Sequence, residues 1–508
     1  MGTTISTIKS NCNTYNLTKT GPLLSLRSYS SPTQSKPSNN SRVFQRITTL
    51  RDPKVSIFPI LDQWSTEGNT LKEPQFQRFV RELRARKRYS HALQLCEWVS
   101  TSKLCPVSSG NLAVQLDLIG AVRGIDAAES YFNKLTEKEK DEKTYGALLS
   151  CYVREGLVDK SLLHMQKMKE IGCASSPLVY NNLMCLFSRT GQPEKIPDVL
   201  TDMKQNDVSP NNFSYRICIN SYGERCDYDS MEKLLEEMEC QSHINMDWTT
   251  YSTAVNHFIR ADLKEKALVV VKKLEAKLNK DALGYNHLIS HYAHLGNKNE
   301  VMRLWGLQKV VCKKQVNRDY ITMLGMLGKL GELEESEVVL KEWESSCQTF
   351  DFRVPNVLLI GLCSKGLIEK AETTLKNIIK TGKTPIPNSW AIISLGYMEV
   401  ENMEKAFECM KEALAVADGS PGWRPKPKLV SSILNWLGEK GEIAEVEAFV
   451  SSLRSVITVN QEMYQALIKA NVRGGKGVDE IIESMNYDNV DIDEETEKIL
   501  GLRKGATE

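Results

Sequence analysis

The sequence lacks several features that would assign it to a familiar class of protein. No apolar run approaches the roughly 18 residues of a membrane-spanning helix, so none is expected. The thirteen cysteines form no CxxC pair, which favours reduced, mostly buried thiols over a disulfide framework. The formal net charge is only +1. Global charge therefore predicts no polyanionic partner, and any nucleic-acid binding must depend on a local surface.

Sequence motifs of the common enzyme classes are also missing. The chain has no nucleophile elbow, HExxH, Walker loop, dinucleotide fingerprint or zinc-deaminase signature. We therefore expect no enzymatic activity and no cofactor. His287, His291 and His294 share one face of a predicted helix, as zinc ligands can, but no carboxylate or thiol joins them. Packed or solvated histidines are the favoured interpretation.

The first 50 residues contain no Asp or Glu, although they carry six Lys and Arg and are rich in Ser, Thr and Asn. This composition predicts an organellar transit peptide over residues 1–30, with disorder to about residue 50. Two alternatives stay open. A disordered tail has the same composition, and Gly2 with Ser6 matches a myristoylation pattern.

A period of about 35 residues dominates the rest of the chain. Each anchor residue is followed eleven residues later by a turn position, and glycine occupies eight of these twelve positions. Tyrosine is the most frequent anchor, and the full set is Phe76, Ala113, Tyr145, Tyr180, Tyr215, Tyr251, Tyr285, Tyr320, Pro355, Trp390, Val430 and Tyr464.

Each period predicts a helix, a short turn and a second helix. In residues 142–176, apolar residues recur at helical spacing on both sides of Gly156, which supplies the positive φ that ends the first helix. A short helix with one apolar stripe needs a partner to be stable. Stacking the hairpins buries both helices, so we expect an all-α, right-handed superhelical solenoid with a continuous concave face.

The register divides the chain into four parts. After the transit peptide, residues 52–72 are expected to cap the N-terminal end, and residues 496–508 to form a C-terminal tail. The twelve predicted repeats fill residues 73–495, as 73–109, 110–141, 142–176, 177–211, 212–247, 248–281, 282–316, 317–351, 352–386, 387–426, 427–460 and 461–495.

The repeats resemble the pentatricopeptide repeat. The resemblance is carried by the Tyr anchor at repeat position 4, the Gly at position 15, and phrases such as TYGALLSCYVREGLVDKSLLHMQKM and LLIGLCSKGLIEKAETTL. It covers residues 73–495, and the uniform spacing resembles the P-type class. It implies binding of single-stranded RNA in an organelle, with the mitochondrion expected and the chloroplast as the alternative.

The resemblance also implies which residues contact RNA. In this family one base is read per repeat, by the side chain at repeat position 5 and by the last residue, while apolar side chains at position 2 sandwich the base. Asn181 with Asn211 resembles a pyrimidine-reading pair. Ser252 with Asp281 resembles a guanine-favouring pair, and Ser431 with Asn460 an adenine-favouring pair. Arg216, Asp247, Asn286 and Asn356 occupy reading positions in pairs that depart from the standard code.

Two functions from different classes follow. The first is an RNA-binding adaptor that acts by occupancy in RNA processing, stability, splicing or translation. The second is a helical-repeat scaffold for protein partners, ribosomal proteins among them. The basic run at residues 81–88 fits either a grip on RNA phosphate or a solvated helix face.

Overall fold

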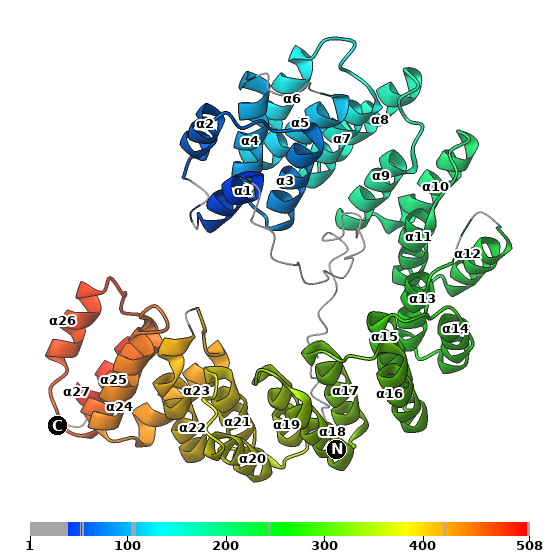
Figure 1. Ribbon diagram of the computed structural model, residues 1–508. Helices are drawn as coiled ribbons and strands as arrows, with labels where there is room; N and C mark the ends of the chain where they lie inside the picture. The colour runs from blue at the N-terminus through cyan, green and yellow to red at the C-terminus, as the bar shows by residue number, and fades with distance from the viewer. Residues whose placement is uncertain are drawn as a thin grey trace. The chain divides into compact units, whose positions relative to one another are not determined.

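The computed structural model describes residues 39–50, 52, 55–102, 108–241, 244, 246–420 and 422–504. Regular structure in these residues is helical, from α1 to α27 (Figure 1), which confirms the predicted all-α class. The chain forms two compact units that meet between Ala267 and Leu268, within α14 (Lys264–Ala276). None of the described helices is long and apolar enough to cross a bilayer.

The first unit contains a short N-terminal pair of helices followed by regular hairpins. Its helices are α1 (Asn39–Thr49), α2 (Phe58–Thr66), α3 (Glu73–Ala85), α4 (Tyr89–Ser102), α5 (Ser109–Arg123), α6 (Ile125–Lys134), α7 (Glu142–Glu155), α8 (Val158–Glu170), α9 (Pro177–Arg189), α10 (Ile196–Gln205), α11 (Asn212–Glu224), α12 (Tyr228–Cys240) and α13 (Trp248–Arg260).

The second unit continues the same alternation to its last helix. Its helices are α15 (Ala282–His294), α16 (Lys298–Cys312), α17 (Asn317–Leu330), α18 (Leu333–Ser346), α19 (Arg353–Ser364), α20 (Ile368–Lys380), α21 (Pro387–Glu399), α22 (Met403–Ala415), α23 (Pro427–Lys440), α24 (Ile443–Arg454), α25 (Gln461–Arg473), α26 (Asp479–Tyr487) and α27 (Glu494–Lys504). The last helix lies where the C-terminal tail is expected, and its Ile499 is buried against Ile468 and Val478.

Within each unit the first helices of successive hairpins form a continuous layer. In the first unit α5 contacts α7, α7 contacts α9, α9 contacts α11 and α11 contacts α13. In the second unit the same relation links α15, α17, α19, α21, α23, α25 and α27 in order. This stacking of hairpins is the solenoid arrangement predicted from the period.

The recurring anchors hold each hairpin together. Tyr180 and Tyr215 are fully buried, and Tyr464 is nearly so. Several anchor hydroxyl groups donate to a polar group on the second helix of the same hairpin. Tyr215 donates to Glu237 Oε1 at 3.0 Å and Tyr464 to Asp488 Oδ2 at 2.6 Å. Tyr215 and Tyr464 therefore bury an aromatic ring while the hydroxyl is satisfied, whereas the buried Tyr180 hydroxyl has no hydrogen-bond partner.

Ion pairs link second helices of neighbouring repeats. Lys169 Nζ lies 2.6 Å from Asp202, Lys204 Nζ lies 2.5 Å from Glu237, and Lys309 Nζ lies 2.9 Å from Glu342. These pairs are partly exposed, so each contributes at most about 1 kcal/mol. The apolar contacts of the first-helix layer carry more of the stability.

The expectation of disorder to about residue 50 is wrong for residues 39–49, which form α1. Val43 and Ile47, four residues apart, are buried, and the ring of Phe44 stacks on Phe79 with centroids 4.7 Å apart. Arg88 Nη1 also donates to the Ile47 carbonyl oxygen at 3.1 Å. Two apolar residues at helical spacing suffice to dock a segment whose composition is otherwise polar. The predicted transit peptide at residues 1–30 lies outside the described residues.

The turn between the two helices needs a left-handed backbone, even where glycine is absent. Seven of the eight glycines at the turn position have positive φ, and Gly441, with φ −75°, does not. The four other turn positions also have positive φ, between 57° and 61°, although L-residues disfavour it; they are Lys87, Cys226, Asp262 and Glu401.

Replacing Glu401 by glycine should stabilise the protein by about 0.5–1 kcal/mol. Glycine adopts φ 61° without the steric penalty of a Cβ, and this gain exceeds the added entropy of the unfolded chain. The measurement is the urea unfolding midpoint. The matched control is Glu412→Gly on the exposed face of α22, which should destabilise by about 1 kcal/mol. Equal destabilisation by both changes would contradict the strain argument.

Candidate functional site

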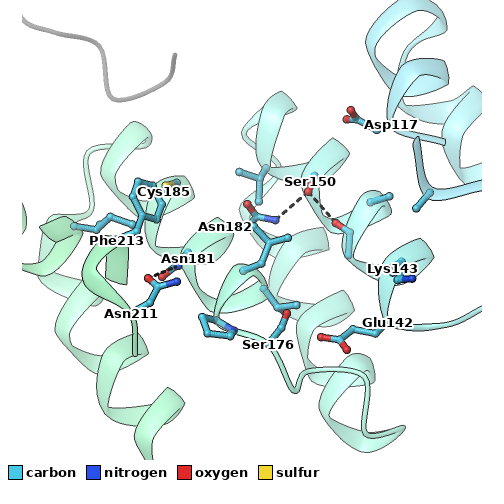
Figure 2. Close-up of a pocket in the computed structure, with 18 of the residues that line it drawn as sticks. Asp117, Glu142, Lys143, Ser150, Ser176, Asn181, Asn182, Cys185, Asn211 and Phe213 are labelled. Carbon is cyan, nitrogen blue, oxygen red and sulfur yellow. Dashed lines mark hydrogen bonds between the residues drawn. The ribbon is translucent and has the colours of Figure 1, made fainter. Parts of the chain in front are cut away.

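A groove of about 1060 Å³ runs along the first helices of the first unit (Figure 2). Its lining comes from α5, α7, α9 and α11, with Arg84 added by α3. The second helices contribute nothing to this lining. The layer of first helices therefore presents a concave, solvent-accessible surface, whereas the anchors on the same helices are buried in the hairpins.

The lining residues recur at fixed repeat positions. Position 5 supplies Val114, Gly146, Asn181 and Arg216, so the four fifth residues of these repeats face the same groove. The last residues of two repeats, Ser176 and Asn211, lie beside them. The register inferred from the resemblance thus places the expected base-reading side chains together in this part of the chain.

Asn181 and Asn211, the fifth and last residues of one repeat, point toward each other (Figure 2). Asn181 Nδ2 donates to Asn211 Oδ1 over 3.4 Å, which is a long and weak hydrogen bond. Asn211 Oδ1 also caps α11 by accepting from the Ser214 backbone nitrogen at 3.0 Å. Asn181 is only 3% exposed, and its Oδ1 has no hydrogen-bond partner. A buried amide oxygen without a partner is costly, and a ligand that donates to it recovers that cost.

Apolar side chains at position 2 lie on the repeats that carry these two asparagines. Leu178 lines the groove and is 63% exposed, which is unusual for a leucine on a packed helix. Phe213 lines the groove at the equivalent place in the next repeat, and the Arg216 guanidinium lies 5.3 Å from its ring centroid. The exposed Leu178 and the partly buried Phe213 offer apolar surface on which a planar ligand can stack.

Arg216 and Asp247 are connected through one threonine. Arg216 Nη1 donates to Thr249 Oγ1 at 2.7 Å, and this hydroxyl donates to Asp247 Oδ1 at 2.7 Å. Asp247 also caps α13 by accepting from the Thr250 backbone nitrogen at 3.0 Å. Both predicted site residues are therefore held in fixed positions, but Asp247 is already occupied as a helix cap.

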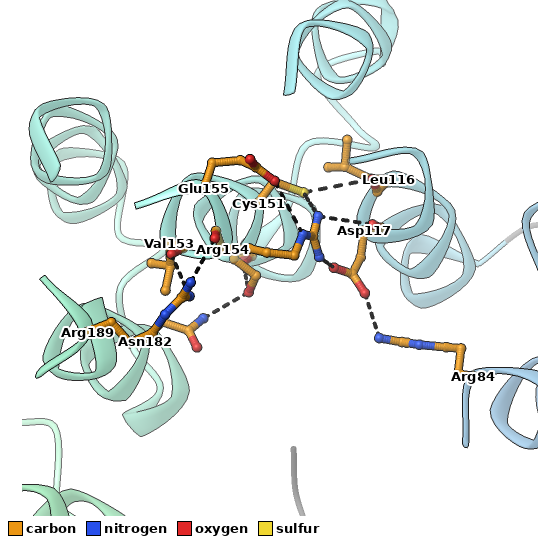
Figure 3. Close-up of polar contacts among 11 residues, drawn as sticks. Arg84, Leu116, Asp117, Cys151, Val153, Arg154, Glu155, Asn182 and Arg189 are labelled. Carbon is orange, nitrogen blue, oxygen red and sulfur yellow. Dashed lines mark hydrogen bonds and ion pairs between the residues drawn. The ribbon is translucent and has the colours of Figure 1, made fainter. Parts of the chain in front are cut away.

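Arg84, Arg189 and Asp117 line the groove, and with Arg154 behind Asp117 they form a basic wall (Figure 3). Asp117 lies between Arg84 and Arg154, with N–O distances of 2.5 and 2.8 Å. Arg189 donates to the carbonyl oxygens of Val153 and Arg154, each at 2.9 Å. Burial opposes the charge of Arg154, but the hydrogen bond that Arg154 donates to Asp117 and the negative charge of Asp117 outweigh burial and raise the pKa of Arg154. Glu155 also lies 4.0 Å from Arg154, so three arginines against two carboxylates leave this wall with a net positive charge.

The sequence analysis did not predict the basic wall, although two of its arginines share one repeat position. Arg154 and Arg189 are 35 residues apart, at position 13 of successive repeats. Of the basic run at residues 81–88, Arg84 joins this wall. Arg86 and Arg88 instead contact Phe44 and the Ile47 carbonyl of α1, so the run is neither wholly solvated nor wholly available to a ligand.

In the second unit, Asn286 is the fifth residue of the repeat at 282–316. Its side-chain nitrogen and oxygen both form hydrogen bonds within the protein. Asn286 Nδ2 donates to Asp319 Oδ1 at 2.7 Å, and Asn286 Oδ1 accepts from Gln308 Nε2 at 3.1 Å. Asn286, Gln308 and Asp319 are all buried. This predicted RNA contact is therefore part of an internal polar network.

Asn356 and Ser431 differ in whether the side chain is hydrogen-bonded within the protein. Asn356 is 4% exposed and its Oδ1 has no partner, as in Asn181. Ser431 Oγ donates to Glu462, with both carboxylate oxygens at 2.7 Å, and not to Asn460. Asn460 instead caps α25 by accepting from the Met463 backbone nitrogen at 3.2 Å. The predicted adenine-favouring pair is thus not assembled.

The remaining predicted pair spans the division between the two units. Ser252 is buried on α13 of the first unit. Asp281 belongs to the second unit, where its Oδ1 caps α15 by accepting from the Leu283 backbone nitrogen at 3.0 Å. Each residue also has a further interaction inside the protein. Their use as a pair stays a prediction.

The three histidines of α15 have different surroundings. His291 is 2% exposed, and burial lowers its pKa to about 3. His294 is exposed, and its Nδ1 lies 2.6 Å from the Ser290 carbonyl oxygen. Within the described part of the chain, no three His, Cys, Asp or Glu side chains are grouped as metal ligands would be. The packed-histidine interpretation accounts for His291.

His257 on α13 packs against α11, one of the helices that line the groove. No sequence motif predicted this contact. It is 4% exposed, and its Nε2 donates to Asn220 Oδ1 on α11 at 3.0 Å. The imidazole lies so close to Gly223 that a Cβ there would come within 2.2 Å of the ring. Close approach of α11 and α13 therefore requires both the glycine and a neutral imidazole.

Known proteins resemble this chain over most of its length. The profile described as PPR repeat family matches residues 175–224, and the one described as PPR repeat matches residues 143–173, 213–242, 319–347 and 354–382. A mitochondrial pentatricopeptide repeat-containing protein of Arabidopsis thaliana is 47% identical over 463 residues, which cover 91% of this chain and 94% of that protein.

Two further similarities extend the comparison. The large ribosomal subunit protein mL101 (rPPR4) of Arabidopsis thaliana is 32% identical over 83% of this chain and 86% of its own length. The crystal structure of the pentatricopeptide repeat protein PPR10 from maize has 18% sequence identity and a TM-score of 0.44, covering 89% of this chain and 69% of that one.

The His257 contact predicts a loss of stability in mild acid. Burial lowers its pKa from 6.5 to about 4, so between these values the unfolded chain binds a proton that the folded chain does not. Stability should therefore fall as the pH falls through this window, by about 2 kcal/mol between pH 6.5 and pH 5. Urea unfolding at several pH values measures the slope. His257→Gln should remove this part of the slope, and an unchanged slope would contradict the assignment.

Proposed function

We propose that this chain, which belongs to the pentatricopeptide repeat family, binds single-stranded RNA along the first-helix groove and acts by occupancy rather than by catalysis. One observation carries the proposal. The amide of Asn181 is buried, lacks a partner for its oxygen, and lies on a groove lined by Leu178 and Phe213. A nucleobase fits this site because it has hydrogen-bond donors on its edge and two flat apolar faces.

The basic wall supports the same proposal. An RNA strand carries one negative charge for each nucleotide, and guanidinium groups bind phosphate oxygens with good geometry. Arg84 and Arg189 line the groove together with Asn181, and Arg154 pairs with the lining residue Asp117. Bases would meet the fifth-position side chains, while the phosphates would meet the arginines. This local charge allows RNA binding by a chain whose formal net charge is only +1.

We place this activity in the mitochondrion. The 47% identical relative is named as mitochondrial, and the acid-free, basic first 50 residues have the composition of a transit peptide. A protein that covers a segment of an organellar transcript can shield it from nucleases or keep it single-stranded. Processing, stability, splicing or translation of that transcript would then depend on occupancy of the segment.

A second candidate is a structural role in the mitochondrial ribosome. It is favoured by the 32% identical relative, which is a protein of the large ribosomal subunit. RNase treatment of a native extract separates the two. An RNA adaptor should lose its high-mass association when its transcript is digested, whereas a ribosomal scaffold should remain with its protein partners.

The basic wall predicts a specific salt dependence. The purified full chain should bind random single-stranded RNA, and its affinity should fall as salt rises. Arg84→Gln and Arg189→Gln should each reduce the slope of log affinity against log salt by about 0.7, because each removes one phosphate contact. Lys405→Gln is the control, since Lys405 lies on the second helix α22, outside the groove. Absence of binding at low salt would overturn the proposal.

A further inference from the structure

Asparagine occurs at repeat position 5 three times, at Asn181, Asn286 and Asn356. All three side chains are buried, with between 3% and 4% exposure. They lie on equivalent first helices, α9, α15 and α19. The residue at position 5 alone does not distinguish these repeats, although their last residues, Asn211, Val316 and Ile386, differ. The hydrogen bonds around each asparagine distinguish them further.

The neighbours divide the three asparagines into two kinds. The oxygens of Asn181 and Asn356 have no hydrogen-bond partner. The amide of Asn286 has both of its functions used, because its nitrogen donates to Asp319 and its oxygen accepts from Gln308. A ligand that bonds to Asn286 would have to replace these internal bonds and leave buried groups unpaired.

The strength of this internal network follows from Asp319. Asp319 is 1% exposed, and its second oxygen accepts from the Val316 backbone nitrogen at 2.9 Å. Removing the Asn286 donor would leave the buried Asp319 carboxylate without one of its hydrogen bonds. An unsatisfied buried charge strongly destabilises the folded protein. The Asn286 side chain therefore stays bound to Asp319 whether or not a ligand is present.

Carboxylates of the following segment also engage two other fifth-position side chains in the second unit. Ser431 donates to Glu462, which is at position 2 of the next repeat. Gln465 Nε2 donates to the carboxylate of Asp493 at 3.2 and 3.3 Å. The arrangement at Asn286 is thus one of three such cases in the described residues of the second unit, and in the first unit Gln77 Nε2 likewise donates to Glu73 Oε1 at 3.2 Å.

We propose that base selectivity resides at Asn181 and Asn356, and that the repeats with Asn286, Ser431 and Gln465 are silent because a neighbouring carboxylate holds the fifth-position donor. This inference rests on the proposed RNA binding and adds to it which repeats read a base. Asp319, Glu462 and Asp493 are then specificity-determining residues, although none of them is expected to touch the base.

Three matched substitutions test the assignment in the full chain. Asn181→Ser and Asn356→Ser should each change the base preference at one position of a bound RNA by about tenfold, as expected for one hydrogen bond. Asn286→Ser should leave every base preference unchanged and lower the thermal unfolding midpoint, because Asp319 loses its donor. Base preference is measured by selection from a randomised single-stranded RNA pool followed by sequencing.

The outcomes separate this inference from the proposed function. If the wild-type chain selects no RNA and binds none at low salt, the proposed function fails and the inference fails with it. If RNA binds and Asn286→Ser changes base preference, only the silent-repeat assignment is overturned. Unchanged preference in both Asn181→Ser and Asn356→Ser, with RNA still bound, also overturns it.

A gain of selectivity provides the converse test. Glu462 is exposed, so Glu462→Ala should fold normally and release the Ser431 hydroxyl. The variant should gain a preference of about tenfold at an RNA position where the wild type has none. Glu439→Ala is the matched control, since it removes an exposed carboxylate that bonds Asn435 rather than a fifth-position residue. Equal selectivity in Glu462→Ala and wild type would contradict the proposal.

Discussion

The packing of each first helix against the next is the contact on which the rest of the structure depends. Buried apolar residues on these helices make it, while the anchors at repeat position 4, such as Tyr180 and Tyr215, are buried within the hairpins. Positions 2, 5, 9 and 12 fall on one face of a helix because they are separated by three or four residues. Fixing the anchor in the hairpin core therefore aims this second face at the groove. One face of each first helix therefore stabilises the fold, and the other face is open to a ligand.

Much of this fold could be predicted from the period alone. The 35-residue spacing located the hairpins, and Gly156 and its equivalents located most turns. The same register could also have identified Lys87 and Glu401 as left-handed residues, since they occupy the glycine position of their repeats. Composition failed at α1, where Val43 and Ile47 dock a polar segment. Composition averages over residues, whereas docking depends on two side chains at the right spacing.

The candidate site was predictable only in part. The repeat position of a side chain does not determine whether that side chain is free to bind a ligand. The register correctly brings Asn181 and Asn211 together in one groove. It cannot show that Asn286 donates a hydrogen bond to Asp319 or that Ser431 donates one to Glu462. Those bonds depend on the side-chain rotamers of the following repeat. The basic wall illustrates the same limit. Arg154 and Arg189 share a register, but the placement of Asp117 between two arginines requires coordinates.

The nature of the partner decides what a fifth-position side chain can still do. A neutral partner such as Asn211 forms a long bond with Asn181 and leaves the Asn181 oxygen open. A carboxylate forms a charge-assisted bond with the amide nitrogen, as Asp319 does with Asn286 at 2.7 Å, and Gln308 occupies the Asn286 oxygen. A carboxylate close to the groove also repels a phosphodiester strand, whereas the arginines of the first unit attract it. One repeated scaffold can therefore alternate between repeats that select a base and repeats that only continue the surface, through single residues outside the reading positions.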